Sequence, residues 1–180
     1  MTWDFPPFVG YGPLLFGMRQ QEALELLGQP EKVETLHAQM AHLIVPAVIC
    51  AATIDLLRRS TLVSFADSAS NNRRPALTFV DDQLRKIHLQ DRRDSLVLRG
   101  VDIWDKNRAA VITGLARGEK VMLFSGGDYY FESLGRRITA PKFWKTNGSI
   151  GLYSREGLEE ECASTQPYEY DPEEITGKEC

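Results

Sequence analysis

The sequence predicts an α+β fold in which helices pack on one face of an antiparallel sheet. One amphipathic helix near the start of the chain ends sharply at a glycine and a proline. Two stretches alternate in polarity around tight polar turns, and the order of a helix followed by strands occurs twice. Alternation around a short turn is typical of antiparallel hairpins with one buried face. We therefore expect residues 1–180 to form a single domain of two tandem helix-plus-antiparallel-sheet modules.

The composition is that of an ordinary globular protein. Of 180 residues, 43% are hydrophobic and 26% are charged, which excludes a disordered or fibrous chain. The longest apolar run, residues 43–57, is interrupted by Pro46 and Asp55 and is too short to span a bilayer as a helix. The N-terminus has neither the basic nor the apolar part of a secretory signal. Three cysteines without a CxxC pair favour a reducing compartment. We expect a cytoplasmic protein with no membrane partner.

The first helix is predicted at residues 18–27. Leu24 and Leu27 fall at helical spacing on an apolar side, and most of the other positions are polar. Gly28 is placed to end the helix as a left-handed cap, and Pro30 cannot continue it. The residues before it, 1–13, are rich in aromatic side chains, proline and glycine and predict an extended arm.

Strands and one further helical segment are expected in the rest of the first half. The spacing of hydrophobic residues distinguishes the strands from the helical segment, and Pro46 is expected to break that segment. The expected elements are a strand at 31–33, the helical segment at 35–59, a strand at 62–65, and a hairpin whose arms, 76–80 and 84–89, flank the turn at 81–83.

The sequence of the second half predicts a similar series of elements, a helix followed by strands. A helix is expected at 104–115, with either Asp102 or Asp105 as its N-cap. The glycine pair at 126–127 predicts a hairpin, because glycine accepts the positive φ of a tight turn. The expected strands are 121–124 and 129–131 in that hairpin, and 150–153 and 158 onward in a third pair around 155–157.

An internal repeat accounts for the similarity of the two halves. Residues 18–27 and 31–33 align with 103–112 and 119–121, allowing a short insertion, and Phe79 and Leu84 align without a gap with Tyr153 and Leu158. The expected repeats are residues 14–95 and 98–163, followed by an acidic C-terminal tail at 164–180.

Reactive residues do not form a catalytic pattern in this sequence. His37 and His42 are five residues apart, which does not place two metal ligands on one helical face, and His88 alternates with apolar residues on an expected strand. Asp81 and Asp82 lie in an expected turn, where aspartate is common for backbone reasons. We expect no catalytic residue, no metal and no cofactor, and therefore a protein that is not an enzyme.

Charge is distributed unevenly along the chain. The net charge is −4, yet residues 156–180 carry nine acidic residues against one lysine, so the preceding part is positive. Arginine pairs such as Arg136-Arg137 and several aromatic residues would suit a nucleic-acid surface. The sequence pI of about 5.4 and the lack of a known nucleic-acid motif argue against direct nucleic-acid binding, which is therefore not the preferred interpretation.

Two sets of residues are the candidates for contact with a protein partner. Aromatic residues and acidic steering charges are common at recognition surfaces. The aromatic set, on the expected sheet, is Trp104, Asp128, Tyr129, Tyr130 and Trp144, and the acidic set is Glu156, Glu159, Glu160, Glu161 and Asp171. For Trp104 and Tyr130, a place in the core between helix and sheet is an equal alternative.

A family resemblance rests on two stretches. Residues 15–30, with Phe16-Gly17-Met18, Glu22 and Leu27-Gly28-Gln29-Pro30, resemble the opening of small α+β modules, and 77–84 resemble the strand–turn–strand that follows. Such modules occur in SmpA/OmlA-type outer-membrane assembly lipoproteins, in the β-lactamase-inhibitor-protein fold, which has two tandem copies, and in immunity proteins of bacterial polymorphic toxin systems. The chain has no lipobox cysteine, which favours the last two.

The resemblance implies an immunity protein that binds a cognate toxin effector and occludes its active site. Without an export signal, the expected toxin acts in the cytoplasm, and a nuclease is one class that fits. The competing functions are an enzyme with an unrecognised site and a general protein-binding adaptor. A neighbouring toxin gene would favour the immunity function, and a metabolic operon would favour an enzyme.

Overall fold

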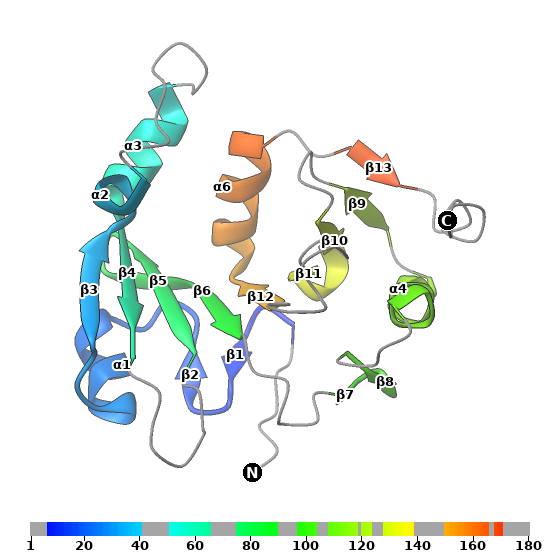
Figure 1. Ribbon diagram of the computed structural model, residues 1–180, viewed down its shortest axis with the longest axis horizontal. Coiled ribbons are helices and arrows are strands. Elements are labelled where there is room, and N and C mark those ends of the chain that lie inside the picture. The colour runs from blue at the N-terminus through cyan, green and yellow to red at the C-terminus, as the bar shows by residue number, and fades with distance from the viewer. Residues whose placement is uncertain are drawn as a thin grey trace.

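The fold is known from a computed structural model, which describes residues 7–40, 51–65, 75–89, 97–103, 108–118, 120–123, 128–138, 150–165 and 168–170. Its centre is one antiparallel sheet of nine strands in the order β13-β9-β10-β11-β12-β6-β5-β4-β3 (Figure 1). The strands are β3 (Lys32–Thr35), β4 (Ser60–Ser64), β5 (Ala76–Val80), β6 (Gln83–Leu89), β9 (Val121–Leu123), β10 (Tyr129–Phe131), β11 (Arg136–Ile138), β12 (Ile150–Tyr153) and β13 (Tyr168–Tyr170). The α+β class is confirmed.

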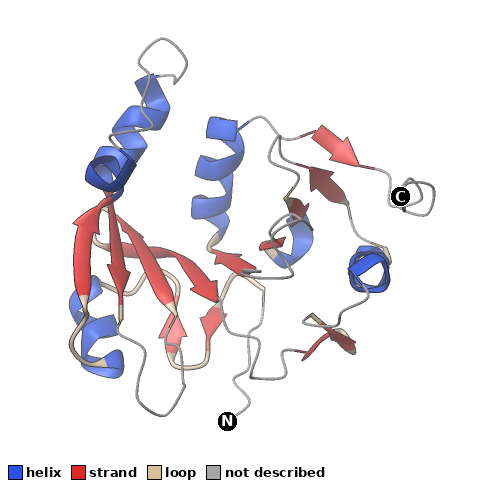
Figure 2. Cartoon of the chain, in the orientation of Figure 1, coloured by secondary structure: helices blue, strands red, loops and turns tan. Residues whose placement is uncertain are grey.

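The remaining elements are helices and two small hairpins (Figure 2). The helices are α1 (Gln20–Leu27), α2 (Leu36–Met40), α3 (Ala51–Arg59), α4 (Arg108–Ala116), the short 3₁₀ helix η1 (Glu132–Leu134) and α6 (Arg155–Thr165). The hairpins pair β1 (Gly10–Tyr11) with β2 (Leu14–Leu15) and β7 (Val97–Leu98) with β8 (Val101–Asp102).

One face of the sheet carries the main hydrophobic core. Leu77 and Phe79 of β5, together with Ile87 of β6, lie there in one cluster with Ala23 of α1 and Leu115 of α4. These strand residues alternate with residues of the opposite face, as the pleat of a strand requires. Helices α1 and α4 therefore cover this first face.

The second face is covered by different helices. Tyr153 of β12 and Tyr130 of β10 form a smaller cluster with Leu158 of α6. Helices α2, α3 and α6 lie on one side of the sheet in Figure 1, and Leu36 of α2 and Leu56 of α3 line one cavity with Thr78. The prediction that all helices pack on a single face is therefore wrong, because successive strand residues supply an apolar surface on both faces.

Several predicted elements of the first half are confirmed. The first helix ends at Leu27, and Gly28 follows with a φ of 83° and donates its N–H to the Leu24 carbonyl at 2.7 Å. Its ψ of −165° differs from that of a left-handed helical residue. Helices α2 and α3 occupy the described parts of the expected helical segment 35–59, and Pro46 lies outside the described residues.

The predicted β5–β6 hairpin is also present, and it forms a tight turn. Asp81 and Asp82 have φ values of 48° and 62°, which are the positive values of a two-residue type I′ turn. The Asp82 carboxylate accepts a hydrogen bond at 3.1 Å from the backbone N–H of Gln20, the first residue of α1. The turn therefore holds the start of the first helix as well as reversing the chain.

The expected third strand pair is wrong in its second arm, because residues 155–165 form α6. Ser154 starts this helix: its hydroxyl accepts a hydrogen bond from the N–H of Gly157 at 2.9 Å, and its carbonyl accepts one from Leu158 at 3.0 Å. Residues 168–170, expected in the acidic tail, form the edge strand β13 beside β9. The proposed alignment of Leu84 with Leu158 consequently joins a strand residue to a helical one.

The second helix is confirmed over its described part, α4 (Arg108–Ala116), and residues 104–107, Asp105 among them, lie outside the described residues. Asp102 belongs to β8, so it is not the N-cap. The described part of the expected N-terminal arm contains β1, which pairs with β2 just after the arm ends. Among the helices described, none combines the length and apolar character needed to cross a membrane.

Candidate functional site

A cleft of about 460 Å³ lies on the second face of the sheet, between α2–α3 on one side and α6 on the other. We call it the α3–α6 cleft. Its volume falls within the range of about 300–1,000 Å³ that is usual for ligand pockets. Its apolar wall consists of Leu36, Leu56, Leu57, Leu62, Ala76 and Val80, and its polar wall of Arg85, Lys86, His88, Tyr153, Glu160 and Glu161.

A break in the pairing of β5 with β6 places two basic residues side by side at the polar wall. Thr78 pairs with Lys86, but Phe79 pairs with Leu84, so Arg85 is an extra residue on β6. Such a bulge changes the direction of the side chains that follow it. As a result Arg85 and Lys86, although adjacent in sequence, both line the cleft.

Arg85 is held from both sides. Its Nη1 donates to Glu156 Oε2 at 2.9 Å, and its Nη2 donates to Gln83 Oε1 at 2.8 Å. Its Nε is buried and has no hydrogen-bond partner. The guanidinium thus links β6 to the first turn of α6 and leaves one donor unmatched.

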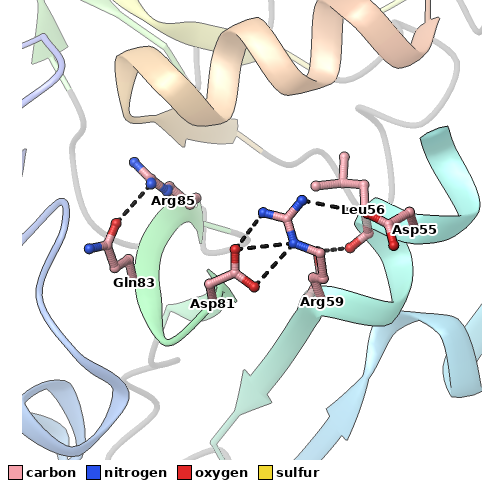
Figure 3. Close-up of polar contacts among 7 residues, drawn as sticks. Asp55, Leu56, Arg59, Asp81, Gln83 and Arg85 are labelled. Atoms are coloured by element: carbon pink, nitrogen blue, oxygen red, sulfur yellow. Dashed lines mark hydrogen bonds and ion pairs between the residues drawn. The ribbon is translucent and has the colours of Figure 1, made fainter.

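A second group of charges lies beside the cleft at the end of α3 (Figure 3). The Arg59 guanidinium binds the Asp81 carboxylate through Nε at 3.1 Å and through Nη2, and it reaches Asp55 at 3.5 Å. The hydrogen bond with Arg59 lowers the pKa of Asp81, and the same interaction raises the pKa of Arg59. Both side chains remain exposed, so this pair lies at the outer rim.

The inner end of the polar wall is a partly buried charge network. Glu161 of α6 binds Nη1 of Arg137, whose Nη2 donates to Asp128 Oδ2 at 2.6 Å. Glu161 also lies 3.8 Å from the Lys86 ammonium. Lys86 in turn lies over the ring of Tyr153, 4.7 Å from its centroid. The network fixes α6 to β6 and to the β10–β11 hairpin.

Tyr153 and His88 are neutral groups at this end. Tyr153 is 1% exposed, and its hydroxyl has no hydrogen-bond partner among the described residues. Burial raises the pKa of this phenol. Burial also lowers the pKa of His88 well below its usual 6.5, and the Lys86 and Arg137 cations lower it further. Burial therefore favours the neutral forms of both side chains.

Glu160 is the remaining charged group of the cleft. Its side chain is half-buried, and no described residue forms an ion pair or a hydrogen bond with it. Burial raises its pKa, and the nearby Asp81 and Glu156 carboxylates add to this, while Arg85 and Arg59 oppose it. A carboxylate in this setting is stabilised by any cation that approaches it.

The structure separates the residues predicted to contact a partner. Glu159 is exposed on α6, and Glu156 is exposed although paired with Arg85. Glu160 and Glu161 face the cleft. Asp128 pairs with Arg137, and Tyr129 is half-buried against the main core. Trp104, Trp144 and Asp171 lie outside the described residues.

Tyr130 is a correction to the aromatic set. Its side chain is completely buried, and its ring meets that of Tyr153 edge to face with centroids 6.0 Å apart. The β10 residues alternate, so that Tyr129 and Phe131 face the main core and Tyr130 faces α6. Tyr130 therefore fills the core, and it is not presented to a partner.

Sequence reasoning missed the basic and neutral residues of the cleft. From the sequence, Arg85, Lys86, His88 and Tyr153 are predicted only as positions of strands. One signal was present: the buried residues Leu84 and Ile87 are three apart, which departs from strict alternation and indicates a bulge.

No group of three or more histidine, cysteine, aspartate or glutamate side chains that could hold a metal ion occurs within the described ranges. Comparisons of the chain with models of known protein families, with curated proteins and with solved structures each found no match.

Proposed function

We propose that the protein is an immunity protein that binds a cognate bacterial toxin acting in the cytoplasm and occludes its active site. The observation that carries the proposal is the α3–α6 cleft, which has one apolar wall and one charged wall. Apart from Glu160, its ionisable groups are paired or held neutral, which suits binding better than acid–base catalysis. On this proposal the protein needs no cofactor and is not an enzyme.

The outer face of α6 supports the same proposal. Glu159 and Glu156 are exposed in the first turns of this helix, next to the cleft that Glu160 and Glu161 line. Exposed acidic residues accelerate association with a positively charged surface, because they steer the encounter before contact is made. A nuclease, which must attract phosphate groups, has such a surface.

The order of strands supports two tandem modules. In each half a helix precedes four antiparallel strands, α1 with β3–β6 and α4 with β9–β12. From the centre of the sheet outwards, β6, β5, β4 and β3 on one side match β12, β11, β10 and β9 on the other. Helices α1 and α4 also share one core. We propose that the halves are copies of one module, and that α2–α3 is an insertion that creates the cleft.

The test is co-expression with the toxin encoded beside the gene. The purified pair should bind tightly, and the toxin's activity should fall in proportion to the immunity protein added. A stable protein that neither binds nor inhibits the neighbouring toxin contradicts the proposal. Copurification without loss of toxin activity would instead identify a general adaptor.

A charge-reversal variant tests the role of α6. Glu159→Lys should lower the association rate at low salt and leave the dissociation rate nearly unchanged. Glu25→Lys, an equal charge change at an exposed position of α1, is the matched control. Equal effects of the two variants would show that net charge, and not the α6 face, governs association.

A further inference from the structure

One carboxylate of the α3–α6 cleft has no cation partner among the described residues. Each nearby cation already has a carboxylate of its own: Arg59 has Asp81, Arg85 has Glu156, Arg137 has Asp128, and Lys86 has Glu161. Glu160 is left over, half-buried at the polar wall and opposite the leucines of α3. The charge complement of the cleft is therefore a single cation.

Two buried polar atoms lie behind the polar wall. Arg85 Nε and the Tyr153 hydroxyl belong to residues that line the cleft, but both atoms are buried, so an occupant does not reach them. The groups that an occupant meets are the Glu160 carboxylate and the apolar wall.

The apolar wall determines which other side chains an occupant must present. Leu36, Leu56, Leu57, Leu62, Ala76 and Val80 form a continuous aliphatic surface across α2, α3, β4 and β5. An aliphatic side chain buried there contributes on the order of 1.5–3 kcal/mol when it leaves water completely. The cleft thus suits a chain that presents aliphatic and basic groups together.

We propose that the α3–α6 cleft binds a segment of the partner protein that places a lysine or arginine against Glu160 and an aliphatic side chain against the leucines of α3. This inference rests on the proposed function, because it names the part of the toxin that the cleft holds. The segment's basic residue pairs with Glu160, and its aliphatic side chain packs on the apolar wall. A toxin loses the use of that basic residue while the cleft holds it.

Short peptides provide the probes. Acetyl-Leu-Lys-Leu-amide is compared with the same peptide carrying norleucine in place of lysine, which keeps the aliphatic stem and removes the charge. Binding is followed by NMR titration of the ¹⁵N-labelled full chain. The lysine peptide should bind at least about tenfold more tightly than the norleucine peptide, with shifts at β6 and α6, because the cation meets a half-buried carboxylate.

Two neighbouring glutamates give a matched pair of variants. Glu160→Gln should weaken binding of the lysine peptide by about tenfold and leave the norleucine peptide unaffected. Glu159→Gln removes the same charge one residue away, outside the cleft, and should change binding less than about twofold. Equal losses in both variants would reduce the effect to general electrostatic attraction and overturn the inference.

A small amine completes the test. n-Butylammonium that binds as tightly as the lysine peptide would identify a site for small amines and overturn the assignment to a partner segment. Shifts confined to residues outside the cleft would also overturn it.

The outcome is separable from that of the proposed function. If Glu160→Gln still binds and neutralises the toxin like the unaltered protein, the cleft inference fails and the immunity function stands. If the unaltered protein ignores the toxin, the immunity function fails, whatever the peptides show. Loss of toxin binding in Glu160→Gln, with retention in Glu159→Gln, supports both.

Discussion

Arg59 and Asp81 are joined twice, once through the backbone and once through their side chains. The Asp81 N–H donates to the Arg59 carbonyl at 3.2 Å, and the Arg59 guanidinium binds the Asp81 carboxylate. The first contact fixes the end of α3 against the β5–β6 turn. In the second, the two side chains point toward one another between the end of α3 and the turn (Figure 3). The position of the helix that forms one wall of the cleft therefore depends on a two-residue turn.

A double-mutant cycle tests the side-chain part of this link. Asp81→Asn keeps a residue that accepts the positive φ of the turn but removes the charge. Because Arg59 lowers the pKa of Asp81, the stabilisation is present above the usual aspartate pKa and is lost as the pH falls through the lowered value. Urea unfolding should show a lower midpoint for the variant at neutral pH and no difference in strong acid. The double variant with Arg59→Gln should lose no more stability than a single variant does. Additive losses of stability would exclude a direct interaction.

Ser154 is expected to determine the stability of α6. Ser154→Ala removes the hydroxyl that accepts the Gly157 N–H and should destabilise the protein by about 1 kcal/mol. Ser154→Thr, which keeps the hydroxyl, serves as the control and should retain most of the stability. Thermal unfolding of the three proteins decides between a capping role and simple burial, since equal losses in both variants would point to packing.

Gly157 is expected to set the distance between α6 and β6. A Cβ at this position would lie 2.8 Å from the carbonyl oxygen of Arg85, which is backbone and cannot turn away. Gly157→Ala should therefore cost about 1–3 kcal/mol, and it should widen the cleft at that point. Glu159→Ala, on the exposed side of the same helix, is the reference. An unfolding midpoint equal to that of the reference would contradict the close approach.

Substitutions of Glu161 and of Glu159 should change the stability of the protein by different amounts, although both are acidic residues of α6. Glu161 binds Arg137 inside a partly buried network, so Glu161→Gln should cost about 1–3 kcal/mol. Glu159→Gln should stay within about 0.5 kcal/mol of the unaltered protein. Urea unfolding at neutral pH measures both. If the two variants were equally stable, the contact with Arg137 would not stabilise the fold, and Glu161 would be available to bind a partner.

His88 should make stability depend on pH. The folded protein keeps this imidazole neutral, whereas the unfolded chain takes up a proton below the usual pKa of 6.5. Stability should therefore fall as the pH is lowered from 6.5, with His88 contributing a slope of up to about 1.4 kcal/mol per pH unit. In His88→Gln that part of the slope should vanish. A slope identical in both proteins between pH 6.5 and pH 5 would mean that His88 is protonated in the fold.

Local patterns predicted most elements, and the errors have physical causes. The end of α1 at Gly28 and the β5–β6 hairpin follow from glycine and turn chemistry, which act over a few residues. The prediction of a strand from residue 158 onward is wrong because Gly157 is typical of a turn, whereas Ser154 caps a helix there.

The cleft could not be predicted in the same way. Its walls come from α3, β6, β12 and α6, which are distant in sequence, and their meeting depends on how strands pair. Glu160 and Glu161 were selected for their charge, yet adjacent residues acquired different roles because only one of them meets Arg137. The spacing of the buried residues Leu84 and Ile87 indicates the bulge at Arg85. Which face of the sheet the side chains after the bulge occupy can be known only from the strand pairing.

The pairing of β6 with β12 has a consequence for synthesis on the ribosome. These strands meet at the middle of the sheet through pairs such as Leu89 with Ile150, yet β12 is made long after β6. Until then, the N-terminal half has an open inner edge, and such edges recruit other chains. A nascent chain stalled before β12 should therefore be the form most prone to aggregate. Supplying the missing C-terminal half as a separate polypeptide should rescue it.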